Sequence, residues 1–363
     1  MMNSRQYILL AIYILKLVPT CCQKNFDIND AKSYYLSPED AKYGGNEKIP
    51  FNRIIVKDYR YDTTKLGYFN YWDFGNKTIR ILLDSNSSPA LTSILNVYFQ
   101  NNLTSSSEKS LLIIVKSLWL QKGMEDTLLK DKSVTTDLAQ FKIGTCNAEL
   151  EIFSVTGDNY FPLLKIKNDF WDASFTRARI NHFLLLPFDS LFTNLAGSDI
   201  ETRLQHKKNY TWSQLHENYM LRFDMPILKA QTTERGVFLS FESFKQNKTS
   251  YPDFVFKQST LTDEVYKSKD EEILTEYWGF FDGKDYYVKT GKTIFKLVRQ
   301  NNSFDFFGSR YLYGKRSFYD KQSTYNYYPG NSSTIGNMPI TTTYRPQIKK
   351  EALQINMETG EAY

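Results

Sequence analysis

The run from Leu111 to Leu120, LLIIVKSLWL, constrains the fold of this chain more than any other stretch of it. Its first five residues are all apolar, at odd and even positions alike. Successive side chains of a β-strand point to opposite faces, so such a run is typical of a strand that is buried on both faces. We therefore expect residues 111–120 to form a central strand of a sheet.

Strand and helix patterns surround this run in a regular order. The clearest helix begins at Ser88, a residue that can cap it, with Pro89 in its first turn. An apolar stripe of helical period follows, formed by Leu91, Ile94, Leu95 and Tyr98. The other expected elements are strands over residues 52–62, 65–72, 77–83, 139–155 and 159–167 and a second helix over 176–195. This order predicts an α+β domain over residues 51–200, with a mixed or antiparallel sheet and two helices on one face.

The second half of the chain has a different pattern, in which short strands follow one another at close, even spacing. Residues 201–235 are predicted to be a helical linker, and residues 236–315 an antiparallel β-meander domain. The expected turns of the meander are Asp282-Gly283, Thr290-Gly291 and Asn301-Asn302. Residues 23–50 are interpreted as a lead-in segment. Residues 316–363, rich in Ser, Thr, Tyr, Asn and Pro, are expected to be irregular.

Residues 1–22, MMNSRQYILLAIYILKLVPTCC, have the layout of a secretory signal peptide. Arg5 gives a positive start, and the apolar run that follows is too short to span a membrane. Two routes remain open. Cleavage after Cys22 would release a secreted protein, whereas lipid attachment at Cys21 or Cys22 would anchor the protein to a membrane. Both routes predict export to the periplasm or the cell surface, with an outer-membrane anchor in the second case.

Composition excludes several classes of partner and fold. The net charge of +5 is spread along the chain without a Lys/Arg block, so nucleic acid is not an expected partner. Cys146 is the one cysteine outside the leader, which excludes a disulfide scaffold and favours a buried, small apolar side chain. The 26 Tyr and 26 Phe residues can bury a large core, since each aromatic side chain buries about 150–250 Å².

Residues that carry out catalysis or bind metals are few and badly spaced. His182 lies within the second helical pattern, and His206 and His216 are ten residues apart, which fits no zinc motif. The G-x-S-x-G sequence of α/β-hydrolases does not occur. We therefore predict no enzyme activity, no cofactor and no metal site.

Two groups of residues are candidates for a ligand or partner surface. Asp58, Arg60 and Asp62 alternate along the first strand and should share one face. That face would be either a polar binding surface or a solvated sheet face with an Arg–Asp pair. Trp278 and Tyr286 belong to a series of aromatic residues on adjacent strands of the meander. Their rings would form either a stacking platform for sugars or peptides or the core of a small domain.

Three stretches resemble uncharacterised exported proteins of Bacteroidota: GVFLSFESFKQN (236–247), EYWGFFDGKDYYVKTGKTIFKLVRQNNSFDFFG (276–308) and ALQINMETGEAY (352–363). This resemblance covers most of residues 212–363 and implies a location in the bacterial envelope and no known activity. The first domain is loosely similar to outer-membrane lipoproteins of the YajG type. The shared points are Asp58-Tyr59-Arg60 at the end of a strand, Lys65-Leu66-Gly67 after it, and a strand–helix–strand order. That similarity concerns the fold and does not carry function.

Together these patterns predict an exported protein that acts without catalysis, as a structural or interaction component of the cell envelope. The alternative is a glycan-binding module of the cell surface or periplasm. The expected partner is an envelope protein in the first case and a polysaccharide in the second. Exposure separates them, because a row of exposed rings would favour the glycan and a buried row the structural role.

Overall fold

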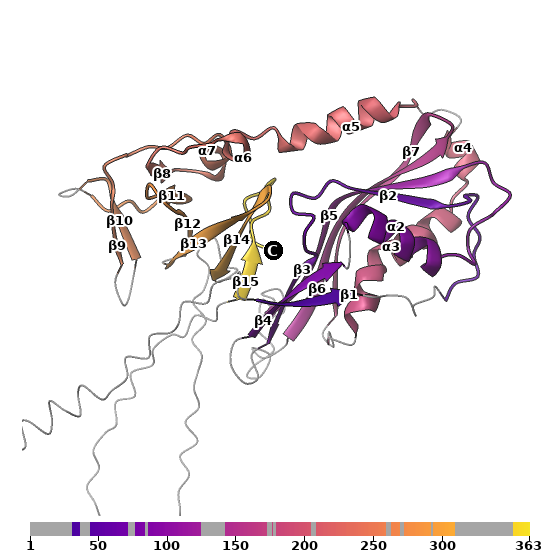
Figure 1. The fold of residues 1–363 in the computed structure, drawn as a ribbon, viewed down its shortest axis with the longest axis horizontal. Coiled ribbons are helices and arrows are strands. Elements are labelled where there is room, and N and C mark those ends of the chain that lie inside the picture. The colour runs from indigo at the N-terminus through magenta and orange to yellow at the C-terminus, as the bar shows by residue number, and fades with distance from the viewer. Residues whose placement is uncertain are drawn as a thin grey trace, which may run out of the picture.

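The fold is that of a computed structural model, which describes residues 31–36, 44–71, 77–83, 86–124, 142–172, 176, 179–204, 208–258, 263–268, 272–291, 293–308 and 351–363. Two sheets lie side by side (Figure 1). The N-terminal sheet is mixed and carries helices, and the C-terminal sheet has six antiparallel strands. The predicted α+β class is therefore confirmed. The leader, with Cys21 and Cys22, lies outside the described residues, as does His206.

The first sheet is built around one long strand, β5 (Ser110–Met124). β6 pairs with it antiparallel on one side, and β2 and β3 pair with it parallel on the other. The strand order is β1-β4-β3-β5-β6-β7, with β2 beside β5. The bounds are β1 (Lys32–Leu36), β2 (Ile54–Asp58), β3 (Gly67–Tyr71), β4 (Lys77–Leu83), β6 (Lys142–Thr156) and β7 (Asn159–Asp172).

Both faces of β5 are covered, as the apolar run predicted. Leu111, Ile113 and Val115 belong to a core that also contains buried side chains of α2 (Ser87–Tyr98) and α3 (Ile180–Ala196). Leu112 and Ile114 face the other way and pack with α5 (Trp212–Met220). The long helices α2 and α3 and the short α4 (Ile200–Leu204) therefore contribute to the core on one face of the sheet, and α5 packs on the opposite face.

Local turn chemistry agrees with the sequence. β6 and β7 form a hairpin across Gly157 and Asp158, and Gly157 has a φ of 57°, a conformation that suits glycine. In the second sheet, Gly283 (φ 100°), Gly291 (φ 58°) and Asn301 (φ 53°) occupy the expected turns. These residues tolerate positive φ values, so the strand ends could be placed from the sequence.

The segment between the two sheets does more than link them. It contains α4 (Ile200–Leu204), α5, the 3₁₀ turn η5 (Leu221–Phe223) and α6 (Pro226–Lys229). A capping box between Thr211 and Gln214 starts α5. Leu215 and Tyr219 are buried on the first sheet, so α5 is part of that sheet's outer layer and extends toward the second sheet (Figure 1).

The second sheet has the order β15-β14-β13-β12-β11-β8. Its consecutive strands β11 to β14 form a meander, as predicted for this part of residues 236–315. The prediction is wrong for β9 and β10, which form a separate two-stranded sheet. The bounds are β8 (Gly236–Phe238), α7 (Phe241–Lys245), β9 (Val255–Gln258), β10 (Asp263–Tyr266), β11 (Gly279–Phe281), β12 (Tyr286–Thr290), β13 (Thr293–Gln300), β14 (Ser303–Gly308) and β15 (Glu351–Gln354).

The structure adds a strand to each of two segments, the interpreted lead-in and the C-terminal segment that was expected to be irregular. The lead-in over residues 23–50 contains β1, which pairs parallel to β4. The segment over 316–363 contains β15, which adds an edge strand to the second sheet beside β14. Both strands are short, with five and four residues, so neither is long enough to show a clear periodic pattern of its own.

Candidate functional site

The pairing along one edge of β5 is interrupted between β2 and β3, and the second sheet docks there. β2 and β3 both pair with the same edge of β5, β2 with residues 111–115 and β3 with residues 120–122. Between them the chain leaves the sheet at Tyr59, whose N–H donates to Val115 O (2.8 Å), and returns at Leu66, whose carbonyl accepts from Leu120 N (2.7 Å). Residues 60–65 therefore bulge out over β5.

Arg60 fills this interruption. Its Nη1 donates to the carbonyl oxygens of Lys65 (2.7 Å) and Leu118 (3.2 Å). Its Nη2 pairs with Asp58 Oδ2 at 2.7 Å, and its side chain is 6% exposed. Buried main-chain carbonyls need partners. The guanidinium thus replaces hydrogen bonds that strand pairing would have supplied.

A buried cluster of charged and polar side chains joins the two sheets here. Lys65 Nζ pairs with Asp62 and with Asp305 Oδ2 (2.7 Å), which lies on β14. Tyr68 donates its hydroxyl hydrogen to Asp305 Oδ2 (2.7 Å), and Gln354 on β15 donates to Asp305 Oδ1 (3.1 Å). We call these five residues, Asp62, Lys65, Tyr68, Asp305 and Gln354, the joint. It connects the two sheets through charge-assisted hydrogen bonds.

Burial gives the two carboxyl groups of the joint different acidities. Burial raises the pKa of Asp305 above its ordinary value, and Lys65 only partly offsets this effect. Burial also acts to raise the pKa of Asp62, but Lys65 and two hydrogen bonds from Thr64 outweigh it and lower that pKa. The pKa of Tyr68 is raised by burial and by Asp305. Lys65, with the help of Thr64, therefore offsets the effect of burial on the pKa of Asp62 fully, and its effect on the pKa of Asp305 only in part.

Strand β15 is held against the first sheet by side chains. Gln121 Nε2 donates to Ala352 O (3.0 Å), and Ala352 N donates to Asn70 Oδ1 (3.3 Å). Farther along, the hydroxyls of Ser117 and Tyr363 are 3.2 Å apart. These contacts extend the joint along β5 and fix where β15 can lie.

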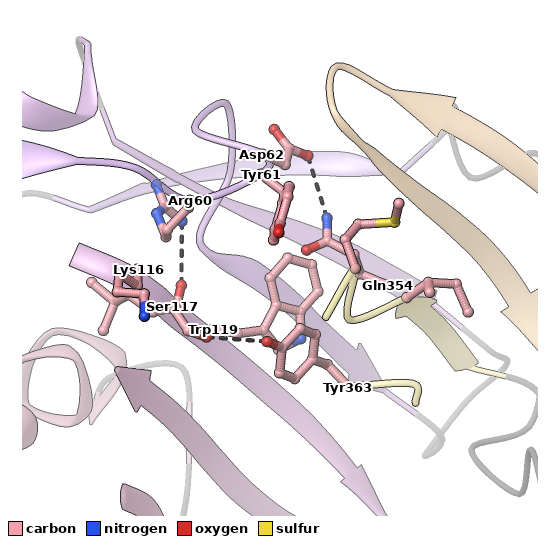
Figure 2. Close-up of a pocket in the computed structure, with 11 residues that line it drawn as sticks. Arg60, Tyr61, Asp62, Lys116, Ser117, Trp119, Gln354 and Tyr363 are labelled. Atoms are coloured by element: carbon pink, nitrogen blue, oxygen red, sulfur yellow. Dashed lines mark hydrogen bonds between the residues drawn. The ribbon is translucent and has the colours of Figure 1, made fainter. Parts of the chain in front are cut away.

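A cavity of about 20 Å³ remains beside the joint (Figure 2). Its lining includes Arg60, Asp62, Trp119, Gln354 and Tyr363. That volume holds about one water molecule, given that roughly 10–15 Å³ is the minimum for one. The site therefore has room for about one water molecule between the sheets.

The first group of predicted site residues lies at the joint rather than on a solvated face. β2 ends at Asp58, so Asp58, Arg60 and Asp62 do not share one strand face. The predicted Arg–Asp pair forms between Asp58 and Arg60. The exposed polar face is wrong, because Arg60 and Asp62 are buried. The reason is tertiary, since the second sheet covers the segment that follows β2.

The second group of predicted site residues lies in the core of the second sheet. Trp278 is 5% exposed, and its ring packs on Phe244 and Phe241, with centroids 4.4 and 5.4 Å away. Its Nε1 is buried without a hydrogen-bond partner. Tyr286 is half-buried, and its hydroxyl contacts that of Thr233. The neighbouring rings of the meander are also buried: Phe280, Phe295, Phe304 and Phe306.

The sequence did not point to Lys65, Tyr68, Asp305 or Gln354. One signal was available, because Asp305 interrupts an aromatic strand, SFDFFG. Its partner Tyr68 is 237 residues away, and no local pattern reveals such a contact. Charged residues are rarely fully buried unless they are paired, so an Asp in such a strand predicts a hidden partner.

The described residues hold neither a metal-ligand cluster nor an exposed thiol. Among those residues, no three His, Cys, Asp or Glu side chains are placed to hold a metal ion. Cys146 is fully buried, and burial raises the pKa of its thiol. Within the same residues, no helix is long and apolar enough to cross a membrane.

Comparisons with known proteins give only a weak likeness. No protein-family model and no curated protein matches the chain. One solved structure, described as an uncharacterized protein, is 13% identical over 46% of this chain and 97% of its own, with a TM-score of 0.28. Another, protein XCC0632 from Xanthomonas campestris, family-model DUF330, is 10% identical over 52% of this chain and 99% of its own, with a TM-score of 0.28. At these values neither structure supports an argument about function, and the resemblance to exported Bacteroidota proteins stays a prediction.

Proposed function

We propose that this protein is a non-enzymatic, exported component of a bacterial cell envelope, with a structural or interaction role. The proposal rests on the buried charged residues of the joint, which connect the two sheets. The ionisable groups of the joint contact one another across two sheets, and the cavity beside them has room for about one water. Charges arranged in this way hold the two sheets in one orientation.

The aromatic residues support the structural role over the glycan-binding alternative. A sugar platform needs exposed ring faces, whereas Trp278 and Phe304 are 5% and 0% exposed. Their neighbours Phe241 and Phe244 cover Trp278. These rings serve as the core of a sheet beside which the described helices, α6 and α7, are short.

The export part of the proposal rests on the layout of residues 1–22. Plain secretion would leave a mature chain that begins after Cys22. Lipid attachment would leave one that begins at Cys21 or Cys22 and is retained in the membrane fraction. The sequence before Cys21, Val18-Pro19-Thr20, matches the lipoprotein pattern poorly, so plain secretion is the first choice.

The test is to express the full chain with its leader in a Bacteroidota host and to measure its intact mass in the soluble and membrane fractions. We expect a mature chain that begins at Cys21, Cys22 or Gln23. A Cys21→Ser/Cys22→Ser variant is the control, because it loses membrane retention only if a lipid is attached. An unprocessed chain that retains Met1 in the cytoplasm would contradict export. Cross-linking of the mature protein in intact cells should recover a recurrent envelope partner, and its absence would contradict the interaction role.

A further inference from the structure

The end of helix α5 carries apolar side chains that the fold leaves in water. Met220 is 46% exposed and Leu221 is 67% exposed. Leu221 is the most exposed large apolar side chain among the described residues. Single exposed apolar side chains are common on protein surfaces, but an adjacent pair beside a hollow is typical of an interaction site.

Such a hollow lies directly next to this pair. It has a volume of about 740 Å³ and is formed by α5, η5 and α6. Its lining consists of Gln214, Glu217, Asn218, Met220, Leu221, Phe223, Asp224 and Lys229. A protruding leucine and a hollow with an aromatic wall are therefore neighbours on one face of the molecule.

The fold holds this face in place from behind. Leu215 and Tyr219, on the opposite side of α5, are buried against the first sheet. Arg222, between Leu221 and Phe223, donates from Nη1 to Tyr59 O (3.0 Å) and from Nε to Glu358 Oε1 (2.8 Å). A surface that is rigid before binding loses little conformational entropy when a partner binds.

Charges of both signs line the rim of the hollow. In the described structure Glu217 has no ion pair, and its Oε1 accepts one hydrogen bond, from the Ser213 hydroxyl (2.8 Å). Lys229 pairs with Asp224, and both side chains are mostly exposed, at 63% and 59%. Glu217 and the exposed ammonium of Lys229 lie on one face and have opposite charges, so Glu217 of one copy can pair with Lys229 of another, in competition with Asp224.

We propose that this face binds a second copy of the chain about a two-fold axis. Leu221 of each copy enters the hollow of the other, and Glu217 of each copy pairs with Lys229 of the other. Two-fold interfaces of this kind require one patch to carry both halves of every contact, and this patch does so. The inference goes beyond the proposed envelope role, which would stand if the protein were a monomer.

Sedimentation velocity of the purified mature chain over a concentration series tests the apolar contact. We expect a reversible dimer in the parent protein. Leu221→Asp should weaken dimerisation by about tenfold or more, because buried interface anchors dominate affinity. At a concentration at which the parent is monomeric, the thermal unfolding of this variant should stay unchanged, since the side chain is exposed in the monomer. Val97→Asp is the matched control, because Val97 is 44% exposed on α2, and it should dimerise like the parent.

A charge exchange tests the geometry. Glu217→Lys and Lys229→Glu should each weaken the dimer, and the combined variant should recover most of the parent's affinity. A parent that is monomeric at every concentration would overturn the proposal and leave the face to another partner. Equal dimerisation of Leu221→Asp and the parent, or no recovery in the combined variant, would overturn the interface described here.

Discussion

The helix-covered face of the first sheet and the joint are both buried, but the first consists of apolar side chains and the second of charged and polar ones. The first is a continuous apolar layer in which α2 and α3 pack on β2, β5 and β6. The second places two carboxylates, an ammonium and a phenol between the sheets. Apolar contacts stabilise in proportion to buried area and tolerate small shifts. Charged hydrogen bonds lose their partners when the sheets move, so we infer that the joint selects one docking geometry.

The largest effect is expected from a charge placed in the apolar layer. Leu95 is fully buried between α2 and the sheet. Leu95→Asp should unfold the first sheet, because an unpaired buried carboxylate costs several kcal/mol against a total stability of roughly 5–15 kcal/mol. Thermal unfolding followed by circular dichroism checks this. Val97→Asp, on the exposed side of the same helix, should melt close to the parent. Unchanged melting of Leu95→Asp would show that the stripe does not face a core.

The second-largest loss of stability is expected from a substitution in the aromatic core of the second sheet. Trp278→Ala removes a buried ring and is expected to cost about 3–5 kcal/mol through transfer and cavity terms. Leu239→Ala is the control, because Leu239 is 46% exposed. Urea unfolding measures both. A Trp278→Ala protein that unfolds with the parent but no longer binds a polysaccharide column would overturn the structural role in favour of glycan binding.

Removing the shared ammonium should weaken the joint. Lys65→Met leaves Asp62 and Asp305 buried without a cation, and breaking a buried ion pair costs about 3–5 kcal/mol. We expect the lower end of this range, since Tyr68 and Gln354 still donate to Asp305. Adding Asp62→Asn and Asp305→Asn to this variant should recover much of the loss in urea unfolding. A single Lys65→Met variant as stable as the parent would show that the carboxylates do not need the ammonium.

The smallest expected effect is a difference between Asp62 and Asp305 in how their contributions to stability depend on pH. The folded-state pKa of Asp62 is lowered. Its contribution is therefore present above the unfolded pKa of about 3.9 and is lost as the pH falls through the folded value. The folded-state pKa of Asp305 is raised. Its contribution is therefore present below about 3.9 and is lost as the pH rises through the folded value.

The two asparagine variants should consequently show opposite trends. Asp62→Asn should cost more stability at neutral pH than in acid, and Asp305→Asn should cost less at neutral pH than in acid. Each unit of pKa difference corresponds to about 1.4 kcal/mol. Urea unfolding of both variants and the parent across this pH range measures the trends, and parallel curves would contradict the unequal sharing of Lys65.

The fold could be predicted from sequence where the information is local. The continuous apolar run Leu111–Val115 placed β5 at the centre, and the stripe containing Leu91 and Leu95 placed a helix on one face. Glycines at 157, 283 and 291 marked turns because few other residues accept their φ values. Each of these signals spans only a few residues.

The joint could not be predicted, because its contacts are long-range. Asp62 lies in a polar stretch that resembles a solvated strand, and only the docking of β14 and β15 buries it. The sequence around Lys65 and the sequence around Asp305 do not show that these two residues pair with each other. Their importance arises from proximity in the folded chain, which no spacing in a single sequence encodes.

The late position of β15 in the chain has a consequence for biosynthesis. Residues 309–350 separate β15 from its neighbour β14. At roughly 5–20 residues per second, a ribosome needs a few seconds to make that stretch. Throughout this delay β14 presents an open edge bearing Phe304 and Phe306, and Asp305 lacks the amide of Gln354. The two sheets can therefore lock together only after the last residues of the chain have been made.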